Sequence, residues 1–324
     1  MDYILPTVLL IAFSFGYRML AKKYGIIDKP NMRSSHIYPT VRGGGVIFYF
    51  ATIIFFLVSG FSFPYFFIGL TLLALISFID DVFSLSVLQR LPVHFVAIFL
   101  ALLQANLLSL PLLWVMLLLF IGVVFINLYN FMDGINGMTG FYSFLTVGTF
   151  LFLSFEENLM DQNFLILILI SIVVFGYFNF RKKAILFAGD VGSMTMAYIV
   201  FMCTLIFCFA LKSPLIILLV SVYVADSGLT LLIRFFKGEK ITEPHREHLY
   251  ERLTNDLGYP HLRISFVYFV IQGLINIIVI FNYNKDLNTQ LIILCSVMAF
   301  ICLGFFFILK SVQNKVALKE VKKL

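Results

Sequence analysis

Residues 111–137 read PLLWVMLLLFIGVVFINLYNFMDGING, an apolar run joined directly to a polar cluster. Positions 111–129 carry no charged side chain and match the length of about 20 residues that an α-helix needs to cross a bilayer. Asparagines, an aspartate and two glycines follow at once. The stretch therefore predicts a transmembrane helix whose end is polar.

The rest of the chain repeats the apolar half of this pattern. Of 324 residues, 61% are apolar and 12% are charged, and the mean hydropathy is +1.01, whereas about 25% of residues are charged in soluble domains. We therefore expect an all-α polytopic membrane protein with a single transmembrane domain over residues 1–324. A soluble enzyme, a disulfide-linked scaffold and a disordered chain are excluded. Ten or eleven spans are expected, near residues 3–20, 43–60, 63–79, 91–108, 111–129, 138–155, 164–180, 191–211, 214–236, 262–281 and 290–309.

The basic residues predict how the chain is oriented in the membrane. Lysine and arginine favour the cytoplasmic side of short loops. They gather here in the first, seventh and ninth loops and in the C-terminal tail, whereas the loop at residues 156–161 holds three acids and no base. We predict an outside N-terminus and a cytoplasmic C-terminus. This topology, with attraction to anionic lipid, explains the net charge of +6 without a nucleic-acid partner.

Polar residues at the ends of spans are costly in a membrane and point to function. Asp80 and Asp81 end the third predicted span. Two adjacent carboxylates can form a base of raised pKa or bind a divalent cation, but acids that only face solvent at a helix end are as common. Asn130 and Asp133 share one face if their helix continues, and Gly134 permits close approach of a ligand.

Two further segments combine glycine with charge. Gly189-Asp190-Val191-Gly192 stands where a span begins, so its amide groups can attract an anion and its carboxylate can hold the Mg²⁺ that accompanies a diphosphate; the alternative is a simple N-cap. Arg42-Gly43-Gly44-Gly45 closes the first loop. Its basic side chains suit a phosphorylated ligand. Membrane anchoring alone would explain these charges but not three successive glycines.

The longest polar stretch, 237–261, contains His245-Arg246-Glu247-His248. We expect a helix from Pro244 to Gly258 with both histidines on one face, either holding a phosphate or metal or lying solvated on the membrane. In the ninth predicted span, residues 226–228 (Asp-Ser-Gly) interrupt the apolar run. They predict a bend there, or the ion site of a secondary transporter.

Taken in order, these segments resemble the polyprenyl-phosphate N-acetylhexosamine-1-phosphate transferases, and the branch that initiates O-antigen and related glycans in particular. The resemblance extends from residue 28 to residue 253. Each motif is generic, but five in this order on one predicted side are specific. They are the Asp28-Lys-Pro…Arg33…His36…Pro39…Arg42-Gly-Gly loop, Asp80-Asp81, Asn130…Asp133-Gly-Ile-Asn-Gly, Gly189-Asp190-Val-Gly-Ser and His245-Arg-Glu-His248.

The resemblance implies that N-acetylhexosamine-1-phosphate passes from a UDP-sugar to polyprenyl phosphate with release of UMP, at the cytoplasmic face of a bacterial inner membrane. It implies Mg²⁺ as the cofactor, with Mn²⁺ as a substitute, and UDP-N-acetylhexosamine, polyprenyl phosphate and the lipid bilayer as partners; a homodimer is also admitted. The implied active site is formed by loops 21–42, 80–90, 130–137, 181–190 and 237–261. Its implied residues are Asp80, Asp81, Asp190, His245 and His248 for catalysis, Lys29, Arg33, His36, Arg42, Asn130, Asp133 and Arg246 for substrate binding, and Asp190 with Asn130 for the metal.

The sequence also departs from the family. Many members carry aspartate where this chain has Asn136, so one carboxylate of the implied site is absent. The main alternative is a secondary transporter, which predicts polar groups near the middle of the bilayer and inverted repeats. A CDP-alcohol phosphatidyltransferase is a second alternative, but its acids lie within one helix pair, whereas the acids here are spread over several loops.

Overall fold

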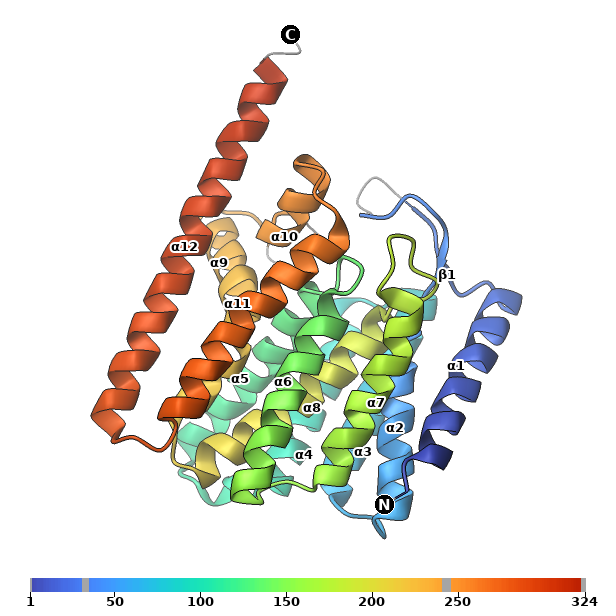
Figure 1. Cartoon of the computed structure of the whole chain (residues 1–324), viewed down its shortest axis with the longest axis vertical. Helices are drawn as coiled ribbons and strands as arrows, with labels where there is room; N and C mark the ends of the chain where they lie inside the picture. The colour runs from blue at the N-terminus through green and yellow to red at the C-terminus, as the bar shows by residue number, and fades with distance from the viewer. Residues whose placement is uncertain (1, 31–34, 241–245, 322–324) are drawn as a thin grey trace.

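The computed structural model describes residues 2–30, 35–240 and 246–321, with side chains up to residue 316. It is built almost wholly from helices that run alongside one another (Figure 1). One small antiparallel sheet pairs β1 (Ile27–Asp28) with β2 (Thr40–Val41). The helices are α1 (Ile4–Lys23), α2 (Val46–Val58), α3 (Pro64–Phe83), α4 (Val87–Gln104), η1 (Leu107–Ser109), α5 (Leu112–Phe131), α6 (Met138–Glu157), α7 (Gln162–Asn179), α8 (Gly189–Ala210), η2 (Pro214–Val220), α9 (Ser221–Phe236), α10 (Leu249–Glu251), η3 (Arg252–Asp256), α11 (His261–Asn282) and α12 (Leu287–Val321).

The predicted all-α polytopic fold is confirmed. In the described part of the chain, ten helices are long and apolar enough to cross a membrane, with η2 and α9 counted as one span, and α2 is a shorter apolar helix of 13 residues. Each of the eleven predicted spans corresponds to one of these. The N-terminus and the C-terminus lie at opposite ends of the bundle, as an odd number of crossings requires (Figure 1).

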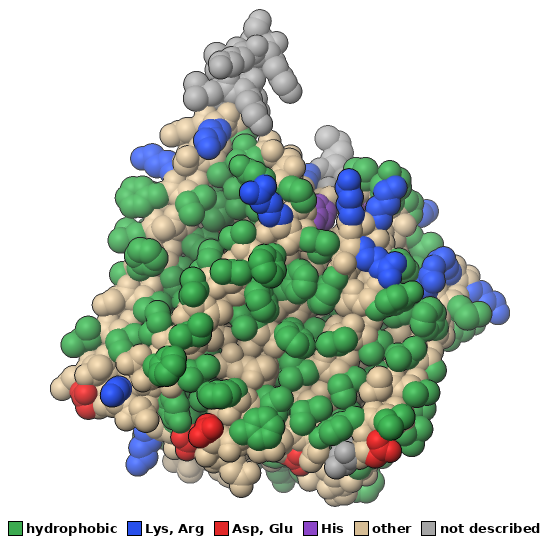
Figure 2. Space-filling view, in the orientation of Figure 1, with side chains coloured by type: hydrophobic (Ala, Val, Ile, Leu, Met, Phe, Trp, Pro, Cys, Tyr) green, Lys and Arg blue, Asp and Glu red, His purple; other side chains and the backbone are tan. Residues whose placement is uncertain are grey.

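Charges divide between the two ends of the molecule. On the face shown in Figure 2, most Lys and Arg side chains gather at the end beyond which α12 projects, and the Asp and Glu side chains lie at the other end. The bundle between them is covered by apolar side chains, as a surface in contact with lipid should be. The separation of charge agrees with the predicted topology, in which the basic end faces the cytoplasm.

The bend predicted at residues 226–228 is not found. Helix α9 runs without interruption from Ser221 to Phe236, and the irregularity lies earlier, where the 3-10 helix η2 changes into α9. Gln272 of α11 fixes that junction, because its Nε2 donates to the carbonyl of Leu218 at 2.8 Å and its Oε1 accepts the N–H of Val222 at 3.1 Å. Polar backbone groups that a change of helix type leaves unpaired need such partners inside a membrane.

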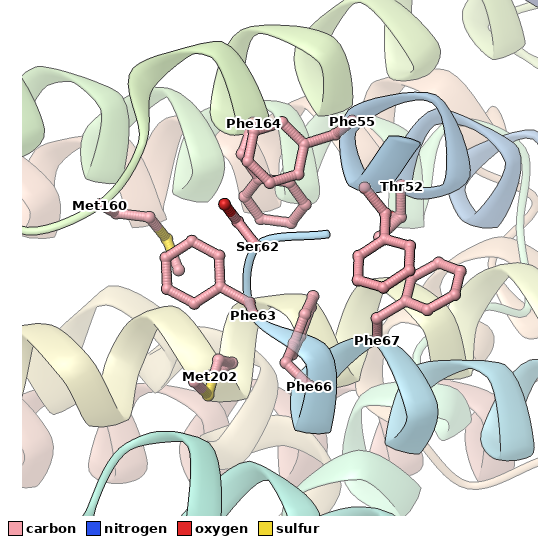
Figure 3. Close-up of a pocket in the computed structure, with 10 residues that line it drawn as sticks. Thr52, Phe55, Ser62, Phe63, Phe66, Phe67, Met160, Phe164 and Met202 are labelled. Carbon is pink, nitrogen blue, oxygen red and sulfur yellow. The ribbon is translucent and has the colours of Figure 1, made fainter. Parts of the chain in front are cut away.

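The end of the bundle away from the basic residues is packed with aromatic side chains. Phe55, Phe63, Phe66 and Phe164 meet there among α2, α3 and α7 and enclose a space of only about 10 Å³, which is about the volume that one water needs (Figure 3). Phe66 and Phe164 meet edge to face, with ring centroids 5.8 Å apart. This small apolar space has no room for a polar ligand.

Candidate active site

Asp81 is a buried anchor for the start of α8. Its carboxylate lies in the last turn of α3, has no exposed side-chain surface, and accepts the backbone N–H groups of Asp190 at 2.9 Å and Val191 at 3.1 Å. The Nε of Arg42 lies 2.6 Å from the same carboxylate. The first amide groups of a helix lack partners within the helix, and an acceptor at this point stabilises them. Asp81 therefore holds both Asp190 and Arg42 in place.

Asp190 lies between two guanidinium groups. Nη2 of Arg42 is 3.3 Å from one oxygen of its carboxylate, and Nη1 of Arg90 is 3.3 Å from the other. Arg90 also forms an ion pair with Asp80, whose second oxygen accepts the N–H of Leu85 at 2.6 Å. Although burial alone would lower it, the pKa of Arg42 is raised because the carboxylates of Asp81 and Asp190 outweigh burial. The result is a fixed array of alternating charges.

Sequence reasoning missed Arg90. The fourth span was predicted to start at residue 91, whereas α4 starts at Val87 after a capping box between Ser86 and Gln89. A charged first turn has low hydropathy, so the sequence predicts Arg90 in a connecting loop. Because a basic residue follows the Asp80-Asp81 pair so closely in the sequence, an ion pair with these acids could have been predicted.

A polar cavity of about 320 Å³ opens beside this array. It lies among the first loop, the α5–α6 loop, the start of α8 and α10. Its lining combines acids, bases and amides, among them Asp190, Arg42, Asn130, Asp133, His36 and Glu251. Side chains from several separate segments of the chain therefore face one space at one end of the membrane bundle.

The three glycines of the first loop serve packing of the backbone. The N–H of Gly44 donates to the carbonyl of Phe187 at 2.8 Å, and that of Gly45 donates to Ala188 at 2.9 Å. A Cβ added to Gly45 would lie 2.3 Å from the Cα of Gly192, which no side chain tolerates. These contacts press the first loop onto the start of α8, and so bring Arg42 to Asp190.

Asn130 and Asp133 both line the cavity but are held differently. Helix α5 ends at Phe131, so Asp133 lies beyond it in the α5–α6 loop, and the predicted helical face is not continued to this residue. Oδ1 of Asn130 accepts a hydrogen bond from Ser193 of α8. Asp133 accepts one from Thr139 at 2.6 Å, and burial raises its pKa to about 7. Near neutral pH this carboxyl is therefore poised between its two protonation states.

The ninth loop is organised by Asp226. Its Oδ1 accepts the N–H of Leu249 at 2.9 Å, and its Oδ2 accepts the N–H of Tyr250 at 3.4 Å and the hydroxyl of Tyr268 at 2.5 Å. Within the described residues 246–258, helix begins only at Leu249, so this part of the helix predicted from Pro244 to Gly258 is shorter than expected. Asp226, predicted to mark a bend or an ion site, is a capping residue instead.

The remaining predicted residues are placed less centrally. His248 is buried, 3% exposed in its side chain, with Nδ1 3.8 Å from Asp226, and it does not line the cavity. Arg246 is half-buried. His36 lines the cavity and contacts Phe187 edge to face, whereas Lys29 is exposed. Two residues lie outside the described part of the chain, namely Arg33 and His245.

Comparison with known proteins agrees with this arrangement. The family described as "Glycosyl transferase family 4" matches residues 63–208, which include Asp80, Asp81, Asn130, Asp133 and Asp190. An undecaprenyl-phosphate alpha-N-acetylglucosaminyl 1-phosphate transferase of Escherichia coli O157:H7 is 24% identical over 321 residues, which cover 90% of this chain and 86% of that protein. The family model and this relative support the polyprenyl-phosphate N-acetylhexosamine-1-phosphate transferase family. The chain is thus similar to sugar-phosphate transferase enzymes.

Two other relatives carry related names. A "Probable undecaprenyl-phosphate N-acetylglucosaminyl 1-phosphate transferase" of Bacillus subtilis (strain 168) is 23% identical over 261 residues, covering 73% of this chain and 72% of that protein. A Yersinia pestis undecaprenyl-phosphate alpha-N-acetylglucosaminyl 1-phosphate transferase is 30% identical over 214 residues, covering 58% of this chain and 57% of that protein.

The structure explains why Asn136 stands where many family members have aspartate. Its Nδ2 donates to the carbonyl of Arg181 at 2.9 Å and more weakly to that of Lys182 at 3.4 Å. The backbone carbonyl of Asn136 accepts a hydrogen bond from the hydroxyl of Ser265 at 2.8 Å. An ionised carboxylate cannot donate to two carbonyls. In this chain the position ties the α5–α6 loop to the loop before α8.

Proposed function

We propose that the protein transfers N-acetylhexosamine-1-phosphate from a UDP-sugar to polyprenyl phosphate and releases UMP. The observation that supports this most directly is the convergence of Asp80, Asp81 and Asp190 with Arg42 and Arg90 beside a polar cavity, at one end of a membrane bundle. Transfer between two phosphorylated substrates requires fixed charges that bind both anions and hold them in line. A lipid-linked acceptor requires such a site at the membrane edge.

In the proposed reaction, an oxygen of the polyprenyl phosphate bonds to the sugar-bearing phosphorus of the UDP-sugar. The bond from that phosphorus to the bridging oxygen breaks, and UMP leaves with that oxygen. Asp81 has both carboxylate oxygens occupied by backbone N–H groups, and Asp80 has its two occupied by Leu85 and Arg90. These contacts favour direct attack by the lipid phosphate over a covalent intermediate on either aspartate. Asp80 and Asp81 then act by positioning Arg90 and Arg42.

The donor set fits Mg²⁺, or Mn²⁺ as a substitute. Asp190, Asn130 and Asp133 line the cavity and carry carboxylate and amide oxygens, the ligands that hard cations prefer. No group of three or more His, Cys, Asp or Glu side chains is arranged to hold a metal by itself in the described residues, but Mg²⁺ usually takes one or two carboxylates and completes its shell with phosphates and water. We assign the ion to Asp190 and Asn130. It would neutralise charge on the diphosphate.

The setting proposed is the cytoplasmic face of a bacterial inner membrane, where the product would begin a lipid-linked O-antigen or another cell-envelope glycan. The basic end of the bundle carries the cavity-forming loops, which agrees with a cytoplasmic site. The UDP-sugar would be a UDP-N-acetylhexosamine, and the N-acetylglucosaminyl names of the relatives favour UDP-GlcNAc.

The test is UMP release by the purified protein in detergent with polyprenyl phosphate and Mg²⁺. UDP-GlcNAc, UDP-GalNAc, UDP-QuiNAc and UDP-FucNAc would be offered separately. We expect release that depends on the lipid, stops with EDTA and is strongest with one donor. No release with any donor, from protein with a cooperative thermal transition, would contradict the proposal and favour the transporter alternative.

A further inference from the structure

Two arginines lie on the outer edge of the bundle, away from the cavity. Helices α1 and α7 pack together at this edge, and both run toward the basic end (Figure 1). The ring of Phe15 on α1 meets that of Phe178 on α7 edge to face, with ring centroids 5.1 Å apart. Arg18 and Arg181 each follow these contact residues by three positions, which is about 4.5 Å along a helix axis. The two arginines therefore stand at a similar depth on neighbouring segments, and we call this site the α1–α7 seam.

Arg181 is held at the surface of the seam by Tyr177. Its Nε donates to the carbonyl of Tyr177 at 2.6 Å, and its guanidinium carbon lies 4.5 Å from the centre of the Tyr177 ring. This ring is exposed, and tyrosine is enriched where membrane helices reach the lipid headgroups. Among the described residues, no acceptor binds the Nη atoms of Arg181. The cation is therefore fixed at headgroup level with its terminal donors available.

Neither arginine has an acidic partner in the described part of the chain. The arginines beside the cavity, Arg42 and Arg90, pair with carboxylates. In residues 2–30, 35–240 and 246–316, no Asp or Glu pairs with Arg18 or Arg181. Arg18 is half-buried, and its enclosed Nε lacks a hydrogen-bond partner there. A cation within a membrane helix is costly unless an anion compensates it. The seam therefore requires an anion from outside these residues.

The surroundings of the two arginines specify the chemistry of this anion. Two guanidinium groups on neighbouring segments suit a phosphate, which accepts hydrogen bonds from both. Lys22, one turn beyond Arg18, and Lys182, next to Arg181, are exposed and add positive charge. This excess repels the ammonium group of a zwitterionic lipid and favours a headgroup of net negative charge. The partner is therefore an anionic phosphate.

An apolar strip runs from the arginines toward the middle of the membrane. Ile11 and Phe15 on α1 and Val173 on α7 are exposed, and all three precede the arginines on helices that run toward the basic end. Exposed apolar side chains of a membrane span are covered by acyl chains. We propose that an anionic phospholipid binds at the α1–α7 seam, with its phosphate between Arg18 and Arg181 and an acyl chain along the strip. Neither arginine lines the cavity, so this inference is independent of the proposed function.

The test measures lipid binding to the purified protein by native mass spectrometry, with phosphatidylglycerol and phosphatidylcholine titrated separately. The wild type should bind one phosphatidylglycerol more tightly than any phosphatidylcholine. In the double variant Arg18→Gln/Arg181→Gln we expect the dissociation constant for phosphatidylglycerol to rise about 30-fold, because each cation near a membrane surface contributes about fivefold. The matched control is Lys310→Gln/Lys315→Gln, which removes the same charge from exposed positions of α12 at the basic end. Its dissociation constant should stay within twofold of the wild-type value.

Two results of this comparison would overturn the inference. Equal weakening in both double variants would show only a general attraction of lipid to the basic end, and equal affinity of the wild type for the two lipids would show that no anionic site exists. If the double variant does not fold, Arg18→Gln alone carries the test, because Arg18 forms no hydrogen bond or ion pair in the described residues. It should raise the dissociation constant for phosphatidylglycerol about fivefold. An unchanged constant would remove Arg18 from the site and contradict the proposal.

Two competitors distinguish a phospholipid from other sources of phosphate. Inorganic phosphate in large excess should not displace phosphatidylglycerol, because it lacks the acyl chain that lies on the strip. Polyprenyl phosphate should not displace it either, because the proposed reaction needs that phosphate at the cavity, which neither arginine lines. Displacement by inorganic phosphate would make the seam a simple anion site, and displacement by polyprenyl phosphate would make it a site for the acceptor. Either result contradicts the assignment to a phospholipid.

Discussion

Replacing Asn136 by aspartate would test whether this position is structural in the present chain. The side chain is buried, 5% exposed, and acts as a donor toward the carbonyls of Arg181 and Lys182. An ionised aspartate would set a negative charge against two carbonyl oxygens. Many family members carry aspartate at this position, so a purely family-based argument predicts that the substitution is harmless or helpful. The geometry predicts that Asn136→Asp destabilises the protein.

The size of the effect follows from the pKa that the new carboxyl would need. To donate a proton to a carbonyl it must stay protonated, and holding a carboxyl of ordinary pKa about 3.9 neutral at pH 7 costs about 4 kcal/mol at 1.36 kcal/mol per pH unit. Relaxation of the loop at residues 181–183 would relieve part of this cost, so we expect a loss of about 2–4 kcal/mol. For a chain of this size about 2 °C of melting temperature corresponds to each kcal/mol, which gives a fall of about 4–8 °C.

The assay is thermal unfolding in detergent at pH 5.5 and pH 8. The new carboxyl would have a folded-state pKa above its unfolded value, so the penalty is absent at low pH and grows as the pH rises toward the folded-state pKa. The melting temperature of Asn136→Asp should therefore fall further below that of the wild type at pH 8 than at pH 5.5. Asn288→Asp, at an exposed position in the first turn of α12, is the control. A variant that melts within 1 °C of the wild type at pH 8 would refute the reasoning.

Two further substitutions test the contacts around the cavity. Arg90→Gln removes the cation that pairs with both Asp80 and Asp190. It should lower the rate of UMP release about 100-fold, and Arg90→Lys should recover part of this rate. A rate within twofold of the wild type in Arg90→Gln would exclude Arg90 from the site. Tyr268→Phe removes a hydroxyl that donates to the carboxylate of Asp226, a bond worth about 1.5–3 kcal/mol, and should speed hydrogen exchange of the amides of α10. Unchanged exchange there would show that Asp226 holds the turn without Tyr268.

The transmembrane architecture was predictable because each span is a long run of apolar residues. The first and last residues of each span were harder to predict, since a charged first turn lowers hydropathy. Helix α4 begins at Val87, and the failure to include its first turn is why Arg90 was missed. The predicted bend in the ninth span was placed at a polar triplet, whereas the irregularity lies at the junction of η2 and α9, where Gln272 of another helix pairs with the backbone.

The roles of the acids were harder to predict than their places. The sequence brings Asp81 to a helix end but does not show that its partners are backbone amides 109 and 110 residues away. Asp226 likewise looked like an ion site until its four donors were seen, on Thr230, Leu249, Tyr250 and Tyr268. A pattern of side chains in the sequence does not show which backbone N–H groups a carboxylate accepts.

One missed signal was present in the sequence. Ser265, Tyr268, Gln272 and Asn276 recur at helical spacing along α11, an otherwise apolar helix. All four are buried and bond to other segments: Ser265 to the α5–α6 loop, Tyr268 to α9, Gln272 to η2 and Asn276 to α6. Buried polar residues in a membrane helix seldom lack a purpose. This stripe identifies α11 as the helix that fixes the segments around the site.

We propose that sugar-phosphate transfer takes place at Asp190, which is held between Arg42 and Arg90. Lipid-dependent UMP release and melting temperature measured together for Asp190→Asn test it most directly. The variant should fold, because Arg42 and Arg90 keep their ion pairs with Asp81 and Asp80, and its turnover should fall at least 100-fold with the melting temperature within a few degrees of the wild type. Normal turnover by folded Asp190→Asn would contradict the account.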